Sequence, residues 1–144
     1  VWDNMLMVLI PDHGCMFRRC YECTDYFHIP MIWCGGALRE GGMRVDKIMN
    51  QSDMAATLLA QLGISHSDYP WSRNVFSPAY THPSAYSTWP SGYIFVDETG
   101  ISSYDLFGDY IIHGGDSTHM TKRLAHGQAV LQTSYTLLDQ LLSE

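Results

Sequence analysis

The sequence predicts a mixed α/β fold, in which a sheet with covering helices is followed by a small antiparallel sheet and a long terminal helix. Three patterns support this prediction. Residues 5–10 form an unbroken apolar run, residues 84–106 alternate between apolar and polar side chains, and apolar residues recur with helical spacing after residue 118.

The first strand is predicted at residues 5–10. This run lacks the alternation of a half-exposed strand, so we expect a parallel strand that helices cover on both faces. A second strand is predicted at residues 29–34, before a pair of glycines. Residues 43–46 follow another glycine pair and are expected to form a short strand or a turn.

A helix is predicted to begin at Ser52 or Asp53 and to end at Leu62. Ser and Asp favour the N-cap, and Gly63 favours the C′ position that ends a helix. The apolar residues at positions 54, 58, 59 and 62 form one stripe, which we expect to face the sheet. We interpret Asp53 as a capping residue rather than as a site residue.

The second half of the chain is expected to begin with a long surface loop at residues 65–83, which are rich in Ser, Pro, Tyr and Trp. Strands are predicted at residues 84–89, 92–97 and 101–106, with a turn at Glu98-Thr99-Gly100. A final helix is predicted at residues 119–142, with Ser117 or Thr118 as its N-cap. The apolar side of this helix is expected to comprise Leu124, Val130, Leu131, Tyr135, Leu138 and Leu142.

Composition limits the class of protein. The chain has 144 residues and is 46% hydrophobic, which is enough for one globular domain with a core. The formal net charge of −7, with only eight Lys and Arg, argues against a surface for nucleic acid or anionic membranes, because both need a basic patch. No apolar stretch reaches the length of a membrane span, and the N-terminus shows no export signal.

The strongest functional signal is Asp12-His13-Gly14, which follows the first apolar run. The carboxyl ends of strands are where α/β sheets place their chemistry. A carboxylate and a neighbouring imidazole can bind one divalent cation if the backbone turns sharply, and Gly14 permits such a turn. We therefore predict that Asp12 and His13 are metal ligands.

Three ordered segments resemble the sulfatase-like branch of the alkaline phosphatase superfamily. Residues 2–14 resemble a signature in which Asp-Asn-Thr and a hydrophobic strand precede Asp-His-Gly, and residues 28–33 are similar to the strand after that metal turn. Residues 45–64 are similar to the family's Asp-containing Thr-Leu-Leu helix, which ends in Gly-Ile. The resemblance implies a partial alkaline-phosphatase-like sheet in residues 1–64, followed by the loop, meander and terminal helix of residues 65–144.

The resemblance also implies a function. The chain would be the C-terminal segment of a metal-dependent transferase or hydrolase of phosphate or sulfate esters, inactive in isolation. In this family the nucleophile, a Ser, Thr or formylglycine, and the other metal ligands precede the Asp-His turn, so we expect them in a longer parent protein. The substrate ester would be bound through that missing N-terminal half.

The imidazole narrows the choice of metal. Calcium-dependent sulfatases of the family often carry Asn where this chain has His13, so the histidine favours zinc or manganese over calcium or magnesium. Histidine instead of asparagine at position 13 also favours phosphoglycerol or phosphoethanolamine transfer over sulfate-ester hydrolysis. The similar lipid-linked polymer synthases imply a membrane-anchored parent, on the extracytoplasmic face of a bacterial membrane or in the periplasm. A sheet that lacks the other half would have an unpaired edge, so the isolated chain is expected to self-associate.

Two further residues are candidates for substrate binding. His28 stands where relatives often have a basic residue near the substrate pocket, and the alternative is a histidine that only satisfies a backbone carbonyl. Arg18 could contact a negative substrate group, and the alternative is a solvated loop residue. The histidines at positions 66, 82, 113, 119 and 126 match no motif and are expected at surface or capping positions.

The cysteines support a different class of function. Cys15, Cys20 and Cys23, with His13 or His28 as the fourth ligand, could form a structural zinc knot. The chain would then be a zinc-stabilised, non-catalytic binding module whose recognition surface is the aromatic-rich segment 69–89. A disulfide within the same loop is an alternative in an oxidising compartment. A third alternative is a stand-alone domain that kept the fold and lost the chemistry, because two ligands alone bind a metal weakly.

Overall fold

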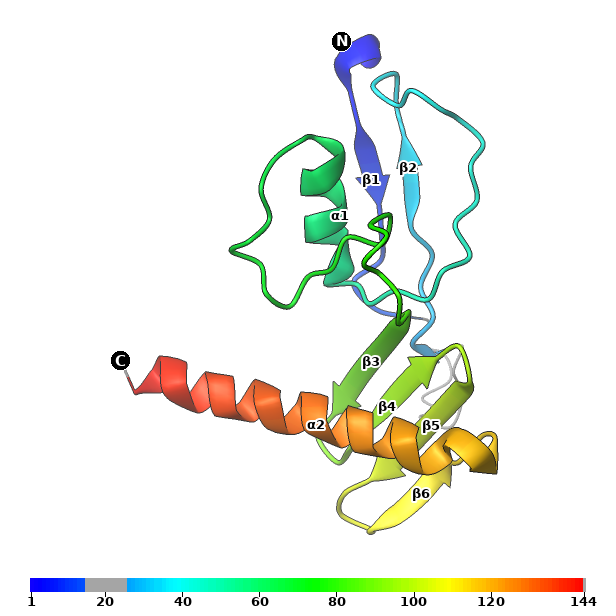
Figure 1. The fold of residues 1–144 in the computed structure, drawn as a ribbon, viewed down its shortest axis with the longest axis vertical. Coiled ribbons are helices and arrows are strands. Elements are labelled where there is room, and N and C mark those ends of the chain that lie inside the picture. Colours follow the sequence, from blue (N-terminus) through cyan, green and yellow to red (C-terminus); the bar gives the residue numbers. More distant parts are fainter. Residues whose placement is uncertain (15–25, 144) are drawn as a thin grey trace. The chain divides into compact units, whose positions relative to one another are not determined.

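The structure is a computed structural model that describes residues 1–14 and 26–143. These residues form a mixed α/β structure with a two-stranded sheet, a four-stranded antiparallel sheet and two α-helices (Figure 1). The mixed α/β class is therefore as predicted. The chain divides into two compact units, unit 1 at Val1–Asp46 and unit 2 at Lys47–Glu144. The helix that the sequence grouped with the first 64 residues thus belongs to unit 2.

Unit 1 contains a short 3-10 helix at Trp2–Asn4 and the strands β1 (Met7–Leu9) and β2 (Ile32–Cys34). The two strands pair in antiparallel orientation, with Leu9 opposite Ile32. The prediction of a parallel first strand is therefore wrong. An apolar run indicates that a strand favours burial, but it does not encode the direction of the strand that supplies its hydrogen bonds.

The expected burial of β1 is also absent. Met7 is 40% exposed and Leu9 is 49% exposed, and no described residue of unit 1 is buried. Residues 43–46, expected to form a strand or a turn, form neither and are exposed, because no neighbouring strand pairs with them.

In unit 2, the helix α1 (Asp53–Gln61) confirms the predicted helix, and Gly63 follows it with a φ of +70°. Its buried face differs from the predicted stripe, because Ala56 and Thr57 are buried and Leu62 is exposed. The loop after α1 packs on this face. The Ala56 N–H donates to Ser72 Oγ at 2.7 Å, for example.

The four-stranded sheet confirms the predicted meander and adds one strand. Its order is β3 (Ser84–Trp89), β4 (Gly92–Asp97), β5 (Gly100–Asp105) and β6 (Tyr110–His113), and all neighbours are antiparallel. Gly100 ends the β4–β5 turn with a φ of +130°. The sequence did not predict β6, which is short and pairs with β5 through an irregular register.

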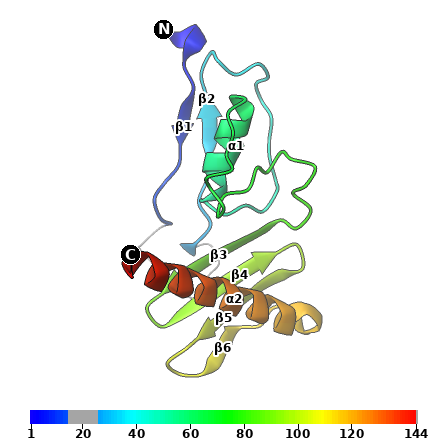
Figure 2. The ribbon, with the colours of Figure 1, turned by 60° about the vertical axis from the view of Figure 1, so that its left-hand side comes forward.

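The terminal helix α2 (Ser117–Leu142) begins slightly earlier than predicted. Asp116, rather than Ser117 or Thr118, is its N-cap, and its side chain accepts a hydrogen bond from the Thr118 N–H. α2 packs across β4 and β5, and its C-terminal half extends past β3 (Figures 1 and 2). The predicted apolar side is therefore covered only in part. Leu124, Val130 and Leu131 are half-buried, whereas Tyr135, Leu138 and Leu142 are exposed.

Arg123 joins the start of α2 to the sheet. Its side chain is fully buried, and its Nε donates to Ser102 Oγ at 2.9 Å. The two terminal nitrogens donate to Thr99, Gly114 and Asp116 over 2.7 to 3.1 Å. These hydrogen bonds use every N–H of the guanidinium, so the buried charge is fully solvated by protein oxygens.

Asp53 joins α1 to the following loop. Its fully buried carboxylate accepts hydrogen bonds from Arg73 Nε at 3.0 Å and Nη2 at 2.7 Å, from the Asn50 N–H at 3.0 Å and from the Tyr80 hydroxyl at 3.2 Å. The capping interpretation of Asp53 is wrong in detail, because the carboxylate accepts from outside α1. Ser52 is the N-cap, without a side-chain hydrogen bond. Asp53 is thus a structural residue and is not available to a metal or substrate.

The same cluster shifts two pKa values. Burial raises the pKa of Tyr80 to about 12, and the nearby Asp53 carboxylate adds to this rise. Burial alone would lower the pKa of the Arg73 guanidinium, but the hydrogen bonds and charge of Asp53 raise it above its ordinary value.

Asp53→Asn is expected to lower the free energy of unfolding of unit 2 by about 2–4 kcal/mol, because Arg73 loses its counter-charge. The Arg73 side chain is 38% exposed, and water therefore offsets part of the loss. Urea unfolding measures the effect. Asp139→Asn, on the exposed surface of α2, is the matched control and should change stability by less than about 0.5 kcal/mol. Equal effects in the two variants would contradict this role of Asp53.

Alkaline unfolding tests Tyr80. The phenol has a higher pKa in the folded chain than its ordinary value of 10.0, so its stabilisation is complete below pH 10.0 and is lost as pH rises towards 12. Tyr80→Phe should therefore flatten the decline of the free energy of unfolding with pH in this window. Tyr135→Phe, at an exposed position of α2, should keep the decline of the parent chain. If the parent chain, Tyr80→Phe and Tyr135→Phe lost stability identically with pH, the raised pKa of Tyr80 would be ruled out as the cause of the decline.

Candidate functional site

The predicted metal ligands follow β1 directly. Asp12 and His13 lie beyond the end of the strand at Leu9, and both side chains are open to solvent, 90% exposed for Asp12 and 55% for His13. The structure thus places this pair at the carboxyl end of a strand, as the sequence predicts.

A hydrogen bond to the main chain defines the state of the His13 ring. Nδ1 lies 2.8 Å from the carbonyl oxygen of Gly14. A carbonyl oxygen only accepts hydrogen bonds, so Nδ1 carries the proton and donates it. The lone pair of the neutral ring is then on Nε2, which lies 3.6 Å from Asp12 Oδ1. The nitrogen that can bind a cation is therefore the one beside the carboxylate.

The separation of these two donor atoms fits a shared metal ion. Oxygen and nitrogen ligands at about 2.0–2.2 Å from a tetrahedral zinc ion lie about 3.4 Å apart, whereas adjacent ligands of an octahedral ion lie about 3 Å apart. The observed 3.6 Å is close to the tetrahedral value. A carboxylate and an imidazole are also a donor set that suits zinc or manganese.

The described part of the chain supplies only these two donors. Within residues 1–14 and 26–143, no three His, Cys, Asp or Glu side chains are grouped so that they could hold a metal ion. A complete metal centre therefore needs further donors from outside the described residues.

A second Asp-His pair, Asp116 and His119, differs from the first in that its two side chains bind each other directly. At the start of α2, His119 Nδ1 lies 2.8 Å from Asp116 Oδ2, which is direct hydrogen-bond distance. The hydrogen bond from His119, together with the Thr118 N–H, lowers the pKa of Asp116. The polar atoms of this pair bind each other, and the pair serves the N-cap, in line with the expected capping or surface role of His119.

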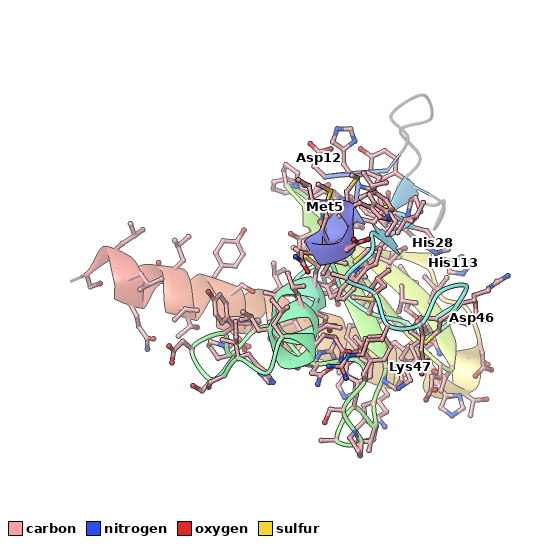
Figure 3. All side chains as sticks on the ribbon, turned by 90° about the horizontal axis from the view of Figure 1, so that it is seen from above. Met5, Asp12, His28, Asp46, Lys47 and His113 are labelled. Atoms are coloured by element: carbon pink, nitrogen blue, oxygen red, sulfur yellow. The ribbon has the colours of Figure 1, made fainter. Side chains whose placement is uncertain are left out.

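His28 lies at the same end of the two-stranded sheet as Asp12 and His13. The antiparallel pairing places the end of β1 beside the start of β2, and His28 shortly precedes β2. Its side chain is exposed and forms no hydrogen bond or ion pair with the rest of the described chain. The labelled side chains of Asp12 and His28 lie apart in Figure 3, so His28 is near the pair without joining it.

Gly14 is in close main-chain contact with Tyr26. A Cβ atom at Gly14 would lie 1.8 Å from the Tyr26 carbonyl oxygen, a distance that atoms cannot adopt. The φ of Gly14 is not in the left-handed region, so the position requires glycine for lack of space rather than for a special turn. The Asp-His-Gly motif points to the glycine but not to its contact with Tyr26, because no sequence pattern links positions 14 and 26.

The other predicted site residues are not placed. Arg18, Cys15, Cys20 and Cys23 lie outside the described residues. Cys34, on β2, has a free and half-buried thiol. None of the described helices is long and apolar enough to cross a membrane. Comparison with known proteins finds no matching family model, curated protein or solved structure.

Asp12→Ala and His13→Ala are each expected to change the free energy of unfolding by less than about 0.5 kcal/mol, because both side chains are exposed and neither supports the fold. Thermal unfolding followed by circular dichroism measures this. A loss above about 1.5 kcal/mol for either variant would assign it a structural role instead.

Proposed function

We propose that the chain is the C-terminal part of a metal-dependent transferase or hydrolase of phosphate or sulfate esters. One observation carries the proposal: the carboxylate of Asp12 and the Nε2 of His13, the ring nitrogen that does not donate to Gly14, lie side by side in solvent, 3.6 Å apart, at the end of β1. The ordered motifs that resemble the sulfatase-like branch of the alkaline phosphatase superfamily supply the reaction class.

In this proposal, Asp12 and His13 hold a zinc or manganese ion. When bound, such an ion draws charge from a non-bridging oxygen of the ester and lowers the pKa of a coordinated hydroxyl. The Asp12 carboxylate offsets part of the charge of the ion, and the hydrogen bond to Gly14 keeps the His13 ring oriented. His28, at the same end of the sheet, offers a second imidazole to an anionic substrate.

Phosphoglycerol or phosphoethanolamine transfer is favoured over sulfate-ester hydrolysis, because an imidazole ligand suits zinc or manganese better than calcium. The nucleophile and the remaining metal ligands would belong to the parent enzyme, which by the same resemblance would be membrane-anchored and extracytoplasmic. The 144-residue chain alone would be catalytically inactive and would bind its metal weakly.

Calorimetric titration with Zn²⁺ and Mn²⁺ tests the metal site. The chain should bind either ion with an affinity weaker than micromolar, because it supplies only two donors. His13→Ala and Asp12→Asn should each weaken binding at least tenfold. His119→Ala is the matched control, since it removes a histidine that is paired directly with an aspartate, and it should leave binding unchanged.

Two results would contradict the proposal. One is the absence of binding at millimolar metal concentrations. The other is zinc binding that survives both ligand substitutions but disappears when thiols are alkylated, which would favour the cysteine-based zinc knot. The ester class is tested by adding glycerol phosphate or a sulfate monoester to the manganese-loaded chain. Because most substrate contacts are expected from the N-terminal half of the parent protein, the phosphate ester should bind only weakly and in a manner that depends on His13. Tighter binding of the sulfate monoester than of the phosphate ester would contradict the preference for phosphoryl transfer.

A further inference from the structure

We propose that Gly14 is a positioning residue, which selects Nε2 of His13 as the metal-binding nitrogen and holds the ring beside Asp12. Its relevance to a metal rests on the proposed function, whereas the choice of the protonated ring nitrogen is a property of the chain itself.

The carbonyl group of Gly14 favours one of the two neutral tautomers of the His13 ring. It accepts the proton on His13 Nδ1 at 2.8 Å, and this interaction exists in only one of the two neutral tautomers. The other tautomer would leave the carbonyl without this donor and would place a proton on Nε2, beside Asp12 Oδ1. An N–H rather than a lone pair would then face the carboxylate, and Nε2 could not bind a cation.

The missing side chain of Gly14 fixes the position of that carbonyl. A Cβ atom would lie 1.8 Å from the Tyr26 carbonyl oxygen and 2.7 Å from the carbon bonded to it. Both contacts are with main-chain atoms, so no flexible side chain could move aside. A larger residue at this position must displace its own backbone or that of Tyr26. Displacement of its own backbone would move the carbonyl to which His13 donates.

Gly41, also in unit 1, is not subject to this constraint. Nothing lies within 4 Å of a Cβ atom built at Gly41, and the φ of Gly41 is not in the left-handed region. Gly41→Ala is therefore a matched control for Gly14→Ala in the same unit. It makes the same chemical change where the structure has space for it.

Nitrogen-15 NMR of the histidine rings in the metal-free 144-residue chain tests the proposal directly. In its neutral form, the His13 ring should carry its proton on Nδ1. Gly14→Ala should shift the ring towards the Nε2-protonated tautomer and weaken Mn²⁺ binding by about tenfold or more. Gly41→Ala should change neither property. The amide signals of β1 and β2 report whether each variant keeps its local fold.

A second pair of variants leaves Gly14 unchanged. The side-chain amide of His13→Gln can lie near the position of Nε2, whereas that of His13→Asn lies near the position of Nδ1. If Nε2 is the metal-binding atom of His13, His13→Gln should retain more Mn²⁺ binding than His13→Asn.

A parent chain with the proton on Nε2, or a Gly14→Ala chain with unchanged tautomer and affinity, would overturn the positioning role. Better retention of Mn²⁺ binding in His13→Asn than in His13→Gln would do the same. If the His13 ring is protonated on Nδ1 but the chain binds neither Zn²⁺ nor Mn²⁺, the tautomer assignment holds and the proposed function is contradicted. Failure of the positioning role can thus be distinguished from failure of the proposed function.

Discussion

The hydrogen bond from His13 Nδ1 to the Gly14 carbonyl is the interaction on which the functional account depends. It determines which ring nitrogen keeps its lone pair, and so whether His13 can share a cation with Asp12. The pair at Asp116 and His119 has the same residue types but a direct 2.8 Å contact. The pair that we propose as metal ligands thus differs by less than 1 Å in spacing from one that stabilises a helix end.

The polar residues that stabilise the fold differ from those that we propose to bind metal or substrate. Asp53 and Arg123 are fully buried, and their charges are satisfied by several protein groups, so they support the fold and cannot reach a ligand. Asp12, His13 and His28 are exposed and add little to the fold. The proposed metal-binding pair lies in unit 1, where none of the described residues is buried. The stable polar networks lie in unit 2, where β4 and α2 form a core.

The sequence predicts the parts of the fold that depend on local patterns. Alternation locates β3, β4 and β5, and helical spacing with Gly63 locates α1. The direction and exposure of β1 depend on its partner β2, which is distant in sequence, so composition alone gave the wrong answer. Arg123 has the sequence context of a solvated helix residue, yet it is buried. The sequence suggests Asp12 and His13 as a pair because they are adjacent, and the structure confirms only that both are exposed after β1. The contact of Gly14 with Tyr26 depends on the path of the chain.

X-ray absorption spectroscopy of the zinc-loaded chain tests the central claim most directly, because it identifies the atoms bound to the metal. Ligation by Asp12 and His13 predicts only oxygen and nitrogen neighbours at about 2.0–2.2 Å, with the outer-shell signal of one imidazole that disappears in His13→Ala. A shell of sulfur atoms at about 2.3 Å would contradict the account, since it would show that cysteine thiolates hold the zinc ion.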